Sequence, residues 1–375
     1  MGIADVRFLP ECILGILALY ALLLAAISVA LIRLRGRTLP VGLSDSRVTV
    51  VIPFKNEATV LHKLIHRCKG VPLPFLFVND HSNDLSEKAL DGIFSEAGLS
   101  LIHLPAHLSG KKAAIHLGAE TVGDDWILTS DADTALNPVF LQKLRSMLHG
   151  GKLAFVLPVR PRPSTGVVRA FFDIEFIVLQ AVGCGAAASG FPLLANGAAF
   201  LFRKDAYFDS LALRDDFEIA SGDDVFTLHA IASASGRKSV AVILPKGPAA
   251  EADFPEGITA LWRQRLRWIG KAGAVKGTAY KSVIWLVFAA NALFLAALVD
   301  AILSGSPDFF ICAGLLKIGG EIFLTGWGVS YFRRRDCLGW ILPGVIIYPF
   351  YFFALLVTAL VHQPRWKQPA RESVD

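Results

Sequence analysis

Two short motifs in this chain carry residue types that could bind a phosphorylated ligand through a metal ion. Asp131 and Asp133 follow a strand-like run at 126–130, and residues two apart in an extended segment point the same way. Two neighbouring carboxylates repel each other, so a divalent cation that can also grip a diphosphate would neutralise them. The second motif, Gln-Arg-Leu-Arg-Trp at 264–268, stands just before an apolar C-terminal third. Together the motifs predict a metal and diphosphate site beside a membrane.

The composition indicates a chain that is part folded domain and part membrane-embedded. Its 375 residues can form one sizeable core plus several membrane spans. Hydrophobic residues make up 54% and charged residues 18%, with a mean hydropathy of +0.51, which is too apolar for an ordinary soluble domain. A net charge of +5 is too small to indicate a nucleic-acid-binding surface. The five cysteines have no paired or metal-type spacing, which favours free thiols in a reducing compartment.

The first apolar stretch, residues 12–32, is about 20 residues long, enough to cross the hydrocarbon core of a bilayer. Acidic Asp5 and Glu11 precede it, whereas a cleavable signal peptide has a basic start and a shorter apolar run. Arginines follow at positions 33, 35 and 37. Because positive residues flank the cytoplasmic ends of spans, the stretch predicts an anchor that is followed by a cytoplasmic segment.

Three more apolar stretches lie near the C-terminus. Residues 282–303 and 309–332 predict two spans joined by a short loop, and three arginines at 333–335 then return the chain to the cytoplasm. The last stretch, 338–361, contains Pro343 and Pro349. It leaves two alternatives open: a single crossing, or a broken or re-entrant stretch that keeps the basic tail inside.

Two charged residues interrupt the third apolar stretch. Lys317 and Glu321 are one helical turn apart, and such a pair in a membrane normally faces protein rather than lipid. The pair predicts either a polar lining where a substrate headgroup enters or a bridge that ties neighbouring helices together.

Between the apolar stretches the sequence becomes that of a folded α/β domain. Apolar runs that predict strands alternate with helical patterns, and the strands are expected at 48–52, 75–78, 101–104 and 126–130. This alternation predicts a mostly parallel sheet with helices on both faces, whose ligands bind beyond the carboxyl ends of the strands. Polar motifs follow three of the runs, so we expect these motifs to meet at one crevice.

Six ordered segments carry a resemblance to a known family. They are Val-Ile-Pro-Phe-Lys-Asn-Glu at 51–57, Val-Asn-Asp-His-Ser-Asn-Asp at 78–84, Gly-Lys-Lys-Ala-Ala at 110–114, Thr-Ser-Asp-Ala-Asp at 129–133, Ser-Gly-Asp-Asp at 221–224 and Gln-Arg-Leu-Arg-Trp at 264–268. In this order they resemble the signatures of membrane-bound family 2 glycosyltransferases, the group of ceramide glucosyltransferase and the cellulose and hyaluronan synthases. The Ser-Gly-Asp-Asp form and the single N-terminal anchor resemble the smaller bacterial members.

The resemblance implies a domain organisation. It predicts an α/β domain of GT-A type at 41–281, which ends in an interfacial basic-aromatic segment. A transmembrane anchor at 1–40 precedes this domain, and transmembrane helices at 282–363 and a basic tail at 364–375 follow it.

The resemblance also implies donor-binding roles. Pro53 and Glu57 match the loop that lines the nucleoside pocket, and Asp80 matches the carboxylate that binds the base or ribose. Lys111 matches the basic residue beside the nucleotide, where a positive charge complements phosphate. The expected donor is a nucleotide diphosphate sugar, with uridine as the expected nucleoside.

Four aspartates match the metal and base positions of the family. Asp131 and Asp133 correspond to the pair that binds Mg2+ or Mn2+, with Asp133 as the direct ligand and Asp131 also beside the donor. Asp224 corresponds to the base that accepts the proton of an attacking hydroxyl, with Asp223 next to it. A helix N-terminal cap is the structural alternative for the second pair.

The last signature places three side chains at the membrane side. By resemblance, Arg267 stabilises the diphosphate leaving group, Trp268 stacks on a sugar or base, and Gln264 completes the motif. An interfacial basic-aromatic helix would place the same residues beside lipid. Residues 196–203 match the segment under the acceptor site, although a plain buried strand would read the same way.

These roles imply an inverting glycosyltransferase that acts on a lipid or lipid-linked glycan. The enzyme would sit in a membrane, which for the smaller bacterial members is the inner membrane, with its catalytic domain in the cytoplasm. A processive polysaccharide synthase is the alternative within the same class, although about four apolar stretches are few for a polymer channel. A catalytically inactive scaffold or sensor is a third hypothesis, against which the intact aspartate pairs speak.

Overall fold

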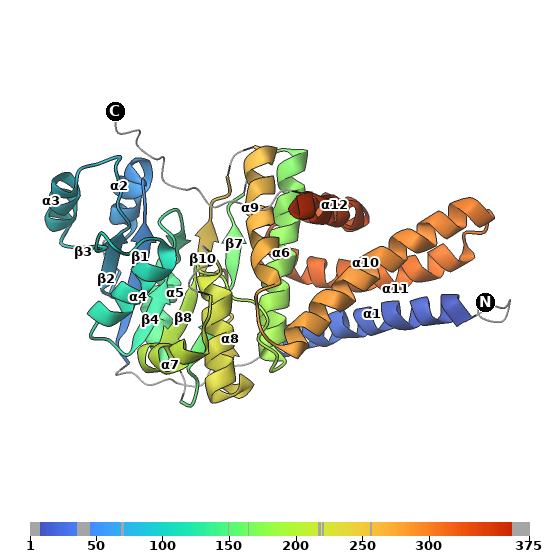
Figure 1. Ribbon diagram of the computed structural model, residues 1–375, viewed down its shortest axis with the longest axis horizontal. Helices are drawn as coiled ribbons and strands as arrows, with labels where there is room; N and C mark the ends of the chain where they lie inside the picture. The colour runs from blue at the N-terminus through green and yellow to red at the C-terminus, as the bar shows by residue number, and fades with distance from the viewer. Residues whose placement is uncertain are drawn as a thin grey trace.

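The computed structural model describes residues 8–35, 46–68, 71–148, 150–163, 165–216, 219, 221–255 and 257–361. An α/β part carries a group of long apolar helices on one side (Figure 1). The expected basic tail at 364–375 and Arg37 lie outside the described residues.

A seven-stranded sheet forms the centre of the α/β part, in the order β3-β2-β1-β4-β8-β6-β9. In this order the strands are Ser100–His103, Phe75–Asn79, Val48–Phe54, Trp126–Thr129, Phe200–Arg203, Ala154–Val156 and Val240–Val242. The first four run parallel, whereas β8 is antiparallel to both of its neighbours. The sheet is therefore mixed but mostly parallel, and its first four strands lie where the sequence predicted them.

Helices cover both faces of the sheet. On one face lie α2 (Ala58–Cys68), α3 (Glu87–Ala97) and α5 (Pro138–Met147), and on the other α4 (Lys111–Thr121), α7 (Lys204–Ser210) and α8 (Asp223–Ser235). Alternation along β1 explains the two cores, because Val50 and Ile52 pack into one and Val51 packs into the other. Burial of apolar side chains on both faces stabilises the strands that end at the polar motifs.

A small second sheet and a long helix connect the main sheet to the apolar helices. The second sheet has the order β5-β10-β7, formed by Ala135–Leu136, Ala250–Ala252 and Val159–Pro161. Helix α6 (Val167–Ala188) lies beside α9 (Ile258–Ala272) in Figure 1 and packs on α1 at Gly185. A Cβ atom at Gly185 would come within 2.5 Å of the Ile27 side chain, so only glycine permits this close contact.

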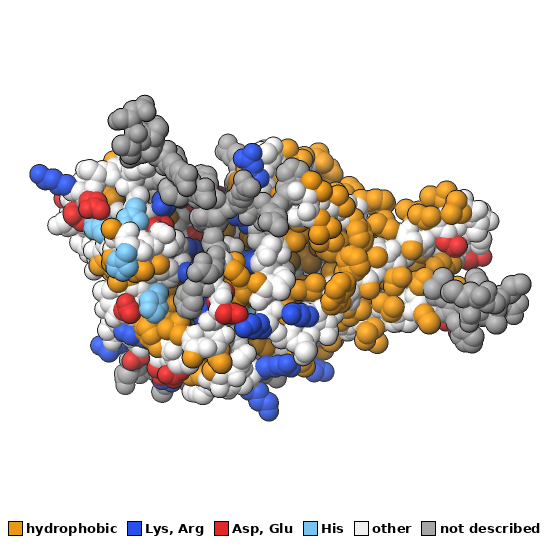
Figure 2. All heavy atoms as spheres, in the orientation of Figure 1, with side chains coloured by type: hydrophobic (Ala, Val, Ile, Leu, Met, Phe, Trp, Pro, Cys, Tyr) orange, Lys and Arg blue, Asp and Glu red, His pale blue; other side chains and the backbone are white. Residues whose placement is uncertain are grey.

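Within the described residues, four helices are long and apolar enough to cross a membrane. They are α1 (Phe8–Arg35), α10 (Thr278–Ser304), α11 (Asp308–Tyr331) and α12 (Ile341–Val361), the last preceded by a 3-10 turn at Arg335–Trp340. Hydrophobic side chains gather over these helices, whereas charged side chains gather over the α/β part (Figure 2). The sequence predicted all four stretches to within a few residues.

Helix α12 has a different orientation from the other three. Helices α1, α10 and α11 run side by side away from the α/β part, whereas α12 is seen nearly end-on beside α6 and α9 (Figure 1). It continues through Pro349 without a break, and Pro343 stands in its first turn, where proline is tolerated. The stretch is therefore not broken: it is one continuous helix, long and apolar enough for a single crossing, and it runs in a different direction from the other three.

The two charged clusters near the apolar helices are internal. Lys317 is fully buried and its ammonium lies 2.8 Å from both carboxylate oxygens of Glu321, which also accepts a hydrogen bond of 2.7 Å from Tyr20 of α1. Of the two alternatives that the sequence left open, a polar lining and a bridge between neighbouring helices, the structure shows the bridge. Arg334 is also buried and donates to Asp173 of α6 at 2.6 Å, so it anchors the end of α11 to the α/β part.

Candidate active site

A cavity of about 450 Å³ lies between the main sheet and helices α6, α9 and α12. It gathers most of the side chains that the sequence singled out, from segments far apart in the chain. The predicted residues in its wall are Lys111, Asp131, Asp133, Asp223, Asp224, Gln264, Arg267 and Trp268. Four of the six signatures therefore meet at one place, whereas of the three strand-end motifs that were expected to share a crevice only the one at 131–133 lines this cavity.

At the sheet end of the cavity, Lys111 lies among three carboxylates. Its ammonium is 2.6 Å from Asp131 and 3.6 Å from Asp223. Burial disfavours the charged form, but Asp131 and Asp223 outweigh it and hold the pKa of Lys111 well above its ordinary value. The lysine is therefore a fixed positive charge that ties the end of β4 to the start of α8.

The carboxylate of Asp133 opens onto the same space and is short of positive charge. Asp133 is exposed at the mouth of this space, yet nearby protein partly desolvates its carboxylate, and this desolvation, together with the charges of Asp131 and Glu57, raises the pKa of Asp133 to about 7. Within the described residues, no group of three or more His, Cys, Asp and Glu side chains is placed to hold a metal by itself. The carboxylates of Asp131 and Asp133, which repel each other, nevertheless suit a Mg2+ or Mn2+ ion whose remaining ligands come from phosphate and water.

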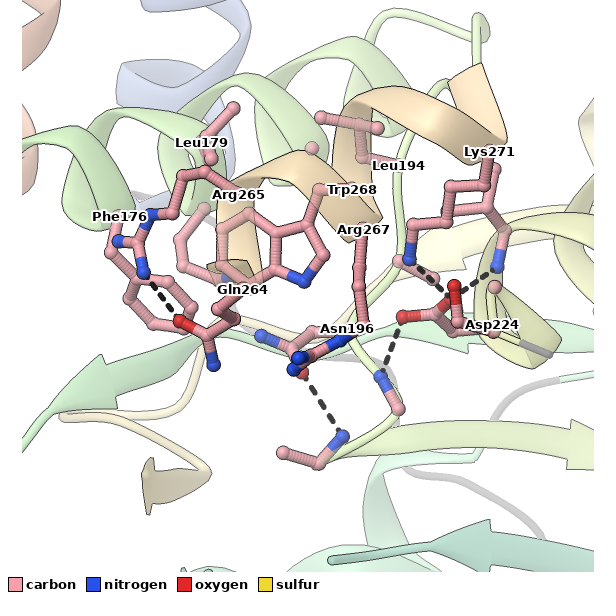
Figure 3. A pocket seen from close by; sticks show the side chains of 18 of the residues that line it. Phe176, Leu179, Leu194, Asn196, Asp224, Gln264, Arg265, Arg267, Trp268 and Lys271 are labelled. Carbon is pink, nitrogen blue, oxygen red and sulfur yellow. Dashed lines mark hydrogen bonds and ion pairs between the residues drawn. The ribbon is translucent and has the colours of Figure 1, made fainter. Parts of the chain in front are cut away.

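The adjacent Asp223 and Asp224 begin helix α8 and have opposite pKa shifts. Burial raises the pKa of Asp223. Burial acts in the same direction on Asp224, but Lys271, 3.7 Å away, and Lys111 outweigh it, so the pKa of Asp224 is lowered. Asp224 also accepts a hydrogen bond of 2.9 Å from the backbone N–H of Gly197 (Figure 3). Its carboxylate is ionised and positioned to accept a proton.

The turn before these aspartates depends on Gly222. Its φ of 88° lies in the left-handed region, and a Cβ atom there would come within 2.9 Å of the Lys271 side chain. The backbone can therefore turn into α8 while Lys271 of α9 passes directly over it. Asp223 and Asp224 do occupy the first turn of the helix, yet both side chains face the cavity.

Helix α9 presents the residues of the last signature to the cavity. Gln264, Arg267, Trp268 and Lys271 follow a spacing of three, one and three residues, which places them along one broad face of the helix. Figure 3 shows the Arg267 side chain reaching toward Asn196 below the helix. Arg267 makes no hydrogen bond or ion pair with any residue that the structure describes, and desolvation lowers its pKa. It is a guanidinium available to an anionic ligand.

The three remaining predicted residues lie outside the wall of this cavity. Pro53 is inside β1 and Glu57 just precedes α2, while Asp80 follows β2 and is buried. One carboxylate oxygen of Asp80 accepts from the N–H of Gly110 at 3.1 Å, and the other is buried without a hydrogen-bond partner among the described residues. Burial, Asp84 and Asp131 raise the pKa of Glu57. These residues line the neighbouring strand ends, next to the carboxylate pair.

The sequence analysis missed several side chains in the cavity wall. Glu175 of α6, Lys271 of α9, and Tyr348 and Tyr351 of α12 had no assigned role. Glu175 had a sequence signal, because it is a carboxylate inside the apolar run Phe-Phe-Asp-Ile-Glu-Phe-Ile-Val-Leu. The tyrosines had none, because nothing in the sequence indicates that α12 turns back toward the sheet.

Apolar side chains also line the cavity. They come from α6, the segment before β8, the loop between α9 and α10, and α12: Leu179, Leu194, Val275, Phe352 and Leu355. The cavity wall thus combines carboxylate and ammonium side chains near the sheet with apolar side chains from α6, α12 and two connecting segments. This arrangement suits a ligand that is charged at one end and hydrocarbon-like at the other.

Comparison with known families supports the assignment of the α/β part. Residues 49–205 match the family model described as "Glycosyl transferase family 2". This part of the chain is therefore similar to family 2 glycosyltransferases, and the chain has a GT-A-like α/β fold that the long apolar helices flank. A comparison with curated proteins finds no match.

One solved structure of similar fold covers almost the whole of this chain. A mannosyltransferase, PcManGT from Pyrobaculum calidifontis in complex with GDP-Man and Mn2+, is similar over 96% of this chain and 100% of its own, with 16% identity and a TM-score of 0.53. Staphylococcus aureus TarS 1-349 is similar over 76% of this chain and 89% of its own, with 12% identity and a TM-score of 0.41. At these identities the likeness concerns the fold.

Proposed function

We propose that this chain is an integral-membrane, inverting hexosyltransferase that moves a sugar from a nucleotide diphosphate sugar to a lipid or lipid-linked glycan. The observation that carries the proposal is a cavity whose wall combines charged side chains of the region that matches family 2 with apolar side chains of α6 and α12. A membrane lipid would place its headgroup among the charges and its hydrocarbon among the leucines. Uridine is the first nucleoside to test in the donor.

The residues of the cavity divide the chemistry between them. Asp131 and Asp133 would hold Mg2+ or Mn2+, which neutralises charge on the donor diphosphate. Arg267 binds the diphosphate as it leaves, and Gln264 and Trp268 orient the sugar. Asp224 accepts the proton of the acceptor hydroxyl as its oxygen attacks the anomeric carbon. One displacement inverts that carbon, so no covalent enzyme intermediate is needed.

Pro53, Glu57 and Asp80 are proposed to bind the nucleoside. The buried, unpartnered oxygen of Asp80 supports this role, because a ribose hydroxyl or base N–H could donate to it. Lys111 is proposed to lie beside the diphosphate and to balance Asp131 and Asp223. Asp223 then has a supporting role next to the base.

The proposed orientation places the domain at 41–281 in the cytoplasm of a bacterial cell, at the inner membrane. The flanking helices would be transmembrane, as the domain boundaries at 1–40 and 282–363 predict. In an otherwise cysteine-free variant, a cysteine at Ser306, in the loop between α10 and α11, should react with an impermeant reagent outside intact cells. A cysteine at the exposed Ser95 of α3 should react only after lysis, and external labelling there would reverse the orientation.

Radiolabelled nucleotide sugars, supplied one by one to membranes that contain the chain, test the whole proposal. We expect label from one donor to enter the organic extract, to require Mg2+ or Mn2+, and to be lost with Asp224→Asn. A ladder of long products would instead assign a processive synthase. Absence of both transfer and metal-dependent donor hydrolysis, with every donor, would leave only a non-catalytic binding role.

A further inference from the structure

A buried network links helix α12 to Gln264 and Trp268 of α9. Arg265, between Gln264 and Arg267 on α9, is only 1% exposed. Its Nε donates to Glu175 of α6 at 2.8 Å, and the other oxygen of Glu175 accepts a hydrogen bond of 3.0 Å from Tyr351 of α12. One carboxylate therefore receives a donor from each of two other helices.

The same guanidinium holds two side chains of the last signature. It donates to the side-chain oxygen of Gln264, as the dashed line in Figure 3 shows, and its carbon lies 4.6 Å from the centre of the Trp268 ring. Phe172 and Phe254 enclose it on further sides, at 4.7 and 5.1 Å. A guanidinium stacked on aromatic rings and held by a carboxylate has little freedom to move. Arg265 is thus placed to fix the orientation of Gln264 and Trp268.

Tyr351 completes the network from the membrane side. Its ring packs edge-on against Phe171, Phe172 and Trp262, with centroids 5.0, 5.8 and 5.6 Å apart, so the hydroxyl is aimed at Glu175. Exposed apolar residues on α12, among them Ile346, Ile347 and Phe350, point away from the protein. Helix α12 is therefore held on one side by the catalytic domain and open to lipid on another.

We propose that Arg265, Glu175 and Tyr351 are positioning residues, through which α12 sets Gln264 and Trp268 in their working orientation. This role rests on the proposed function, because it assumes that Gln264 and Trp268 act on the donor. It gives α12 a part in catalysis as well as in membrane attachment. Loss of the Tyr351 hydroxyl should loosen Glu175, then Arg265, and finally the two side chains that Arg265 holds.

Two readouts in detergent or nanodiscs test the network. The first is the fluorine NMR signal of Trp268 in protein made with 5-fluorotryptophan, identified by its loss in Trp268→Phe. We expect Tyr351→Phe and Arg265→Lys to shift or broaden this signal. The second is steady-state transfer, for which we expect kcat to fall about tenfold in Tyr351→Phe with little change in the KM for the donor.

Tyr331→Phe is the matched control. Tyr331 of α11 is buried, and its hydroxyl donates to the backbone oxygens of Pro245 and Gly247 at 2.9 Å, outside the cavity wall. This variant loses a comparable hydroxyl, so it should lower the melting temperature while leaving kcat and the Trp268 signal unchanged. A merely structural Tyr351 would make the two variants behave alike.

The outcomes separate this proposal from the proposed function. If Tyr351→Phe leaves both the Trp268 signal and kcat as they are in Tyr331→Phe, the network is not a positioning device, although the transferase assignment stands. If wild-type protein transfers no sugar, the transferase assignment fails, and the Trp268 signal alone then decides whether α12 sets the orientation of that residue. A shift in Arg265→Lys without one in Tyr351→Phe would exclude α12 from the network.

Discussion

Two arginines of one helix turn, Arg265 and Arg267, are held in opposite ways. Arg265 is buried and bound to Glu175 and aromatic rings, whereas Arg267 faces the cavity and pairs with no described residue. The comparison extends to the whole site. At the back of the wall, which we define as Arg265 and Glu175, charged side chains pair with each other and fix the geometry of the site. At the front, which we define as the remaining charged side chains of the wall, a ligand can bind to the charges directly or replace their partners.

At the sheet end of the cavity, the charged side chains belong to the front group, because a ligand can reach them. Lys111 lies between Asp131 and Asp223, and Lys271 lies near Asp224, but all of these side chains also reach the cavity. Metal and diphosphate would alter these pairs, whereas they would leave Arg265 and Glu175 in place. Substitutions of the side chains at the front should therefore change catalysis. Substitutions of Arg265 or Glu175 at the back should change the orientation of neighbouring side chains or the stability of the protein.

Asp224→Asn should have the largest effect. The amide cannot accept the proton of the acceptor hydroxyl, so we expect kcat to fall by about 10²–10⁴-fold. Donor binding should remain, because Asn can still accept the hydrogen bond from Gly197. Calorimetric titration with the donor and Mn2+, beside steady-state transfer, measures both quantities. Asp91→Asn on α3, whose side chain is 63% exposed, is the control. Full turnover in Asp224→Asn would show that Asp224 is not the general base.

Removal of the metal should lower the rate of transfer about as much as Asp224→Asn does, but the loss should be reversible. Chelation should stop transfer, and added Mn2+ or Mg2+ should restore it. Asp133→Asn should raise the metal concentration needed for half-maximal activity by about 10–100-fold, since one of two charged ligands is lost. Transfer that is insensitive to chelator, in protein freed of metal beforehand, would show that Asp131 and Asp133 serve another purpose.

Arg267 should show a smaller, graded effect. Arg267→Lys keeps the charge but loses the planar fork, so we expect kcat to fall about tenfold, and Arg267→Ala should lower it about a hundredfold. Because Arg267 has no described protein partner, neither substitution should change the melting temperature by more than about 2 °C. Thermal unfolding followed with the same samples separates the two effects. Equal loss of stability in both variants would place Arg267 in the structural group with Arg265.

The sequence predicted the front of the site better than the back. The strands at 48–54 and 126–129 and the aspartates that follow them obey local rules of alternation and turn chemistry, so both could be placed from the chain alone. Glu175 and Tyr351 meet Arg265 only through packing of three helices from distant parts of the chain. No local pattern specifies such a contact. The crosswise course of α12 was equally hidden, because hydropathy reports burial in lipid and not direction.

If one cavity binds both a charged donor and a hydrocarbon acceptor, a substitution at Leu179, an apolar residue of its wall, tests this most directly. Leu179→Gln should reduce sugar transfer to lipid by at least about tenfold, since a polar amide would lie against the hydrocarbon chain. Metal-dependent hydrolysis of the donor, in which water replaces the acceptor, should continue at the wild-type rate. Both rates measured on one nanodisc preparation decide the matter. Loss of transfer with preserved hydrolysis is the predicted result, and unchanged transfer to lipid would contradict the account.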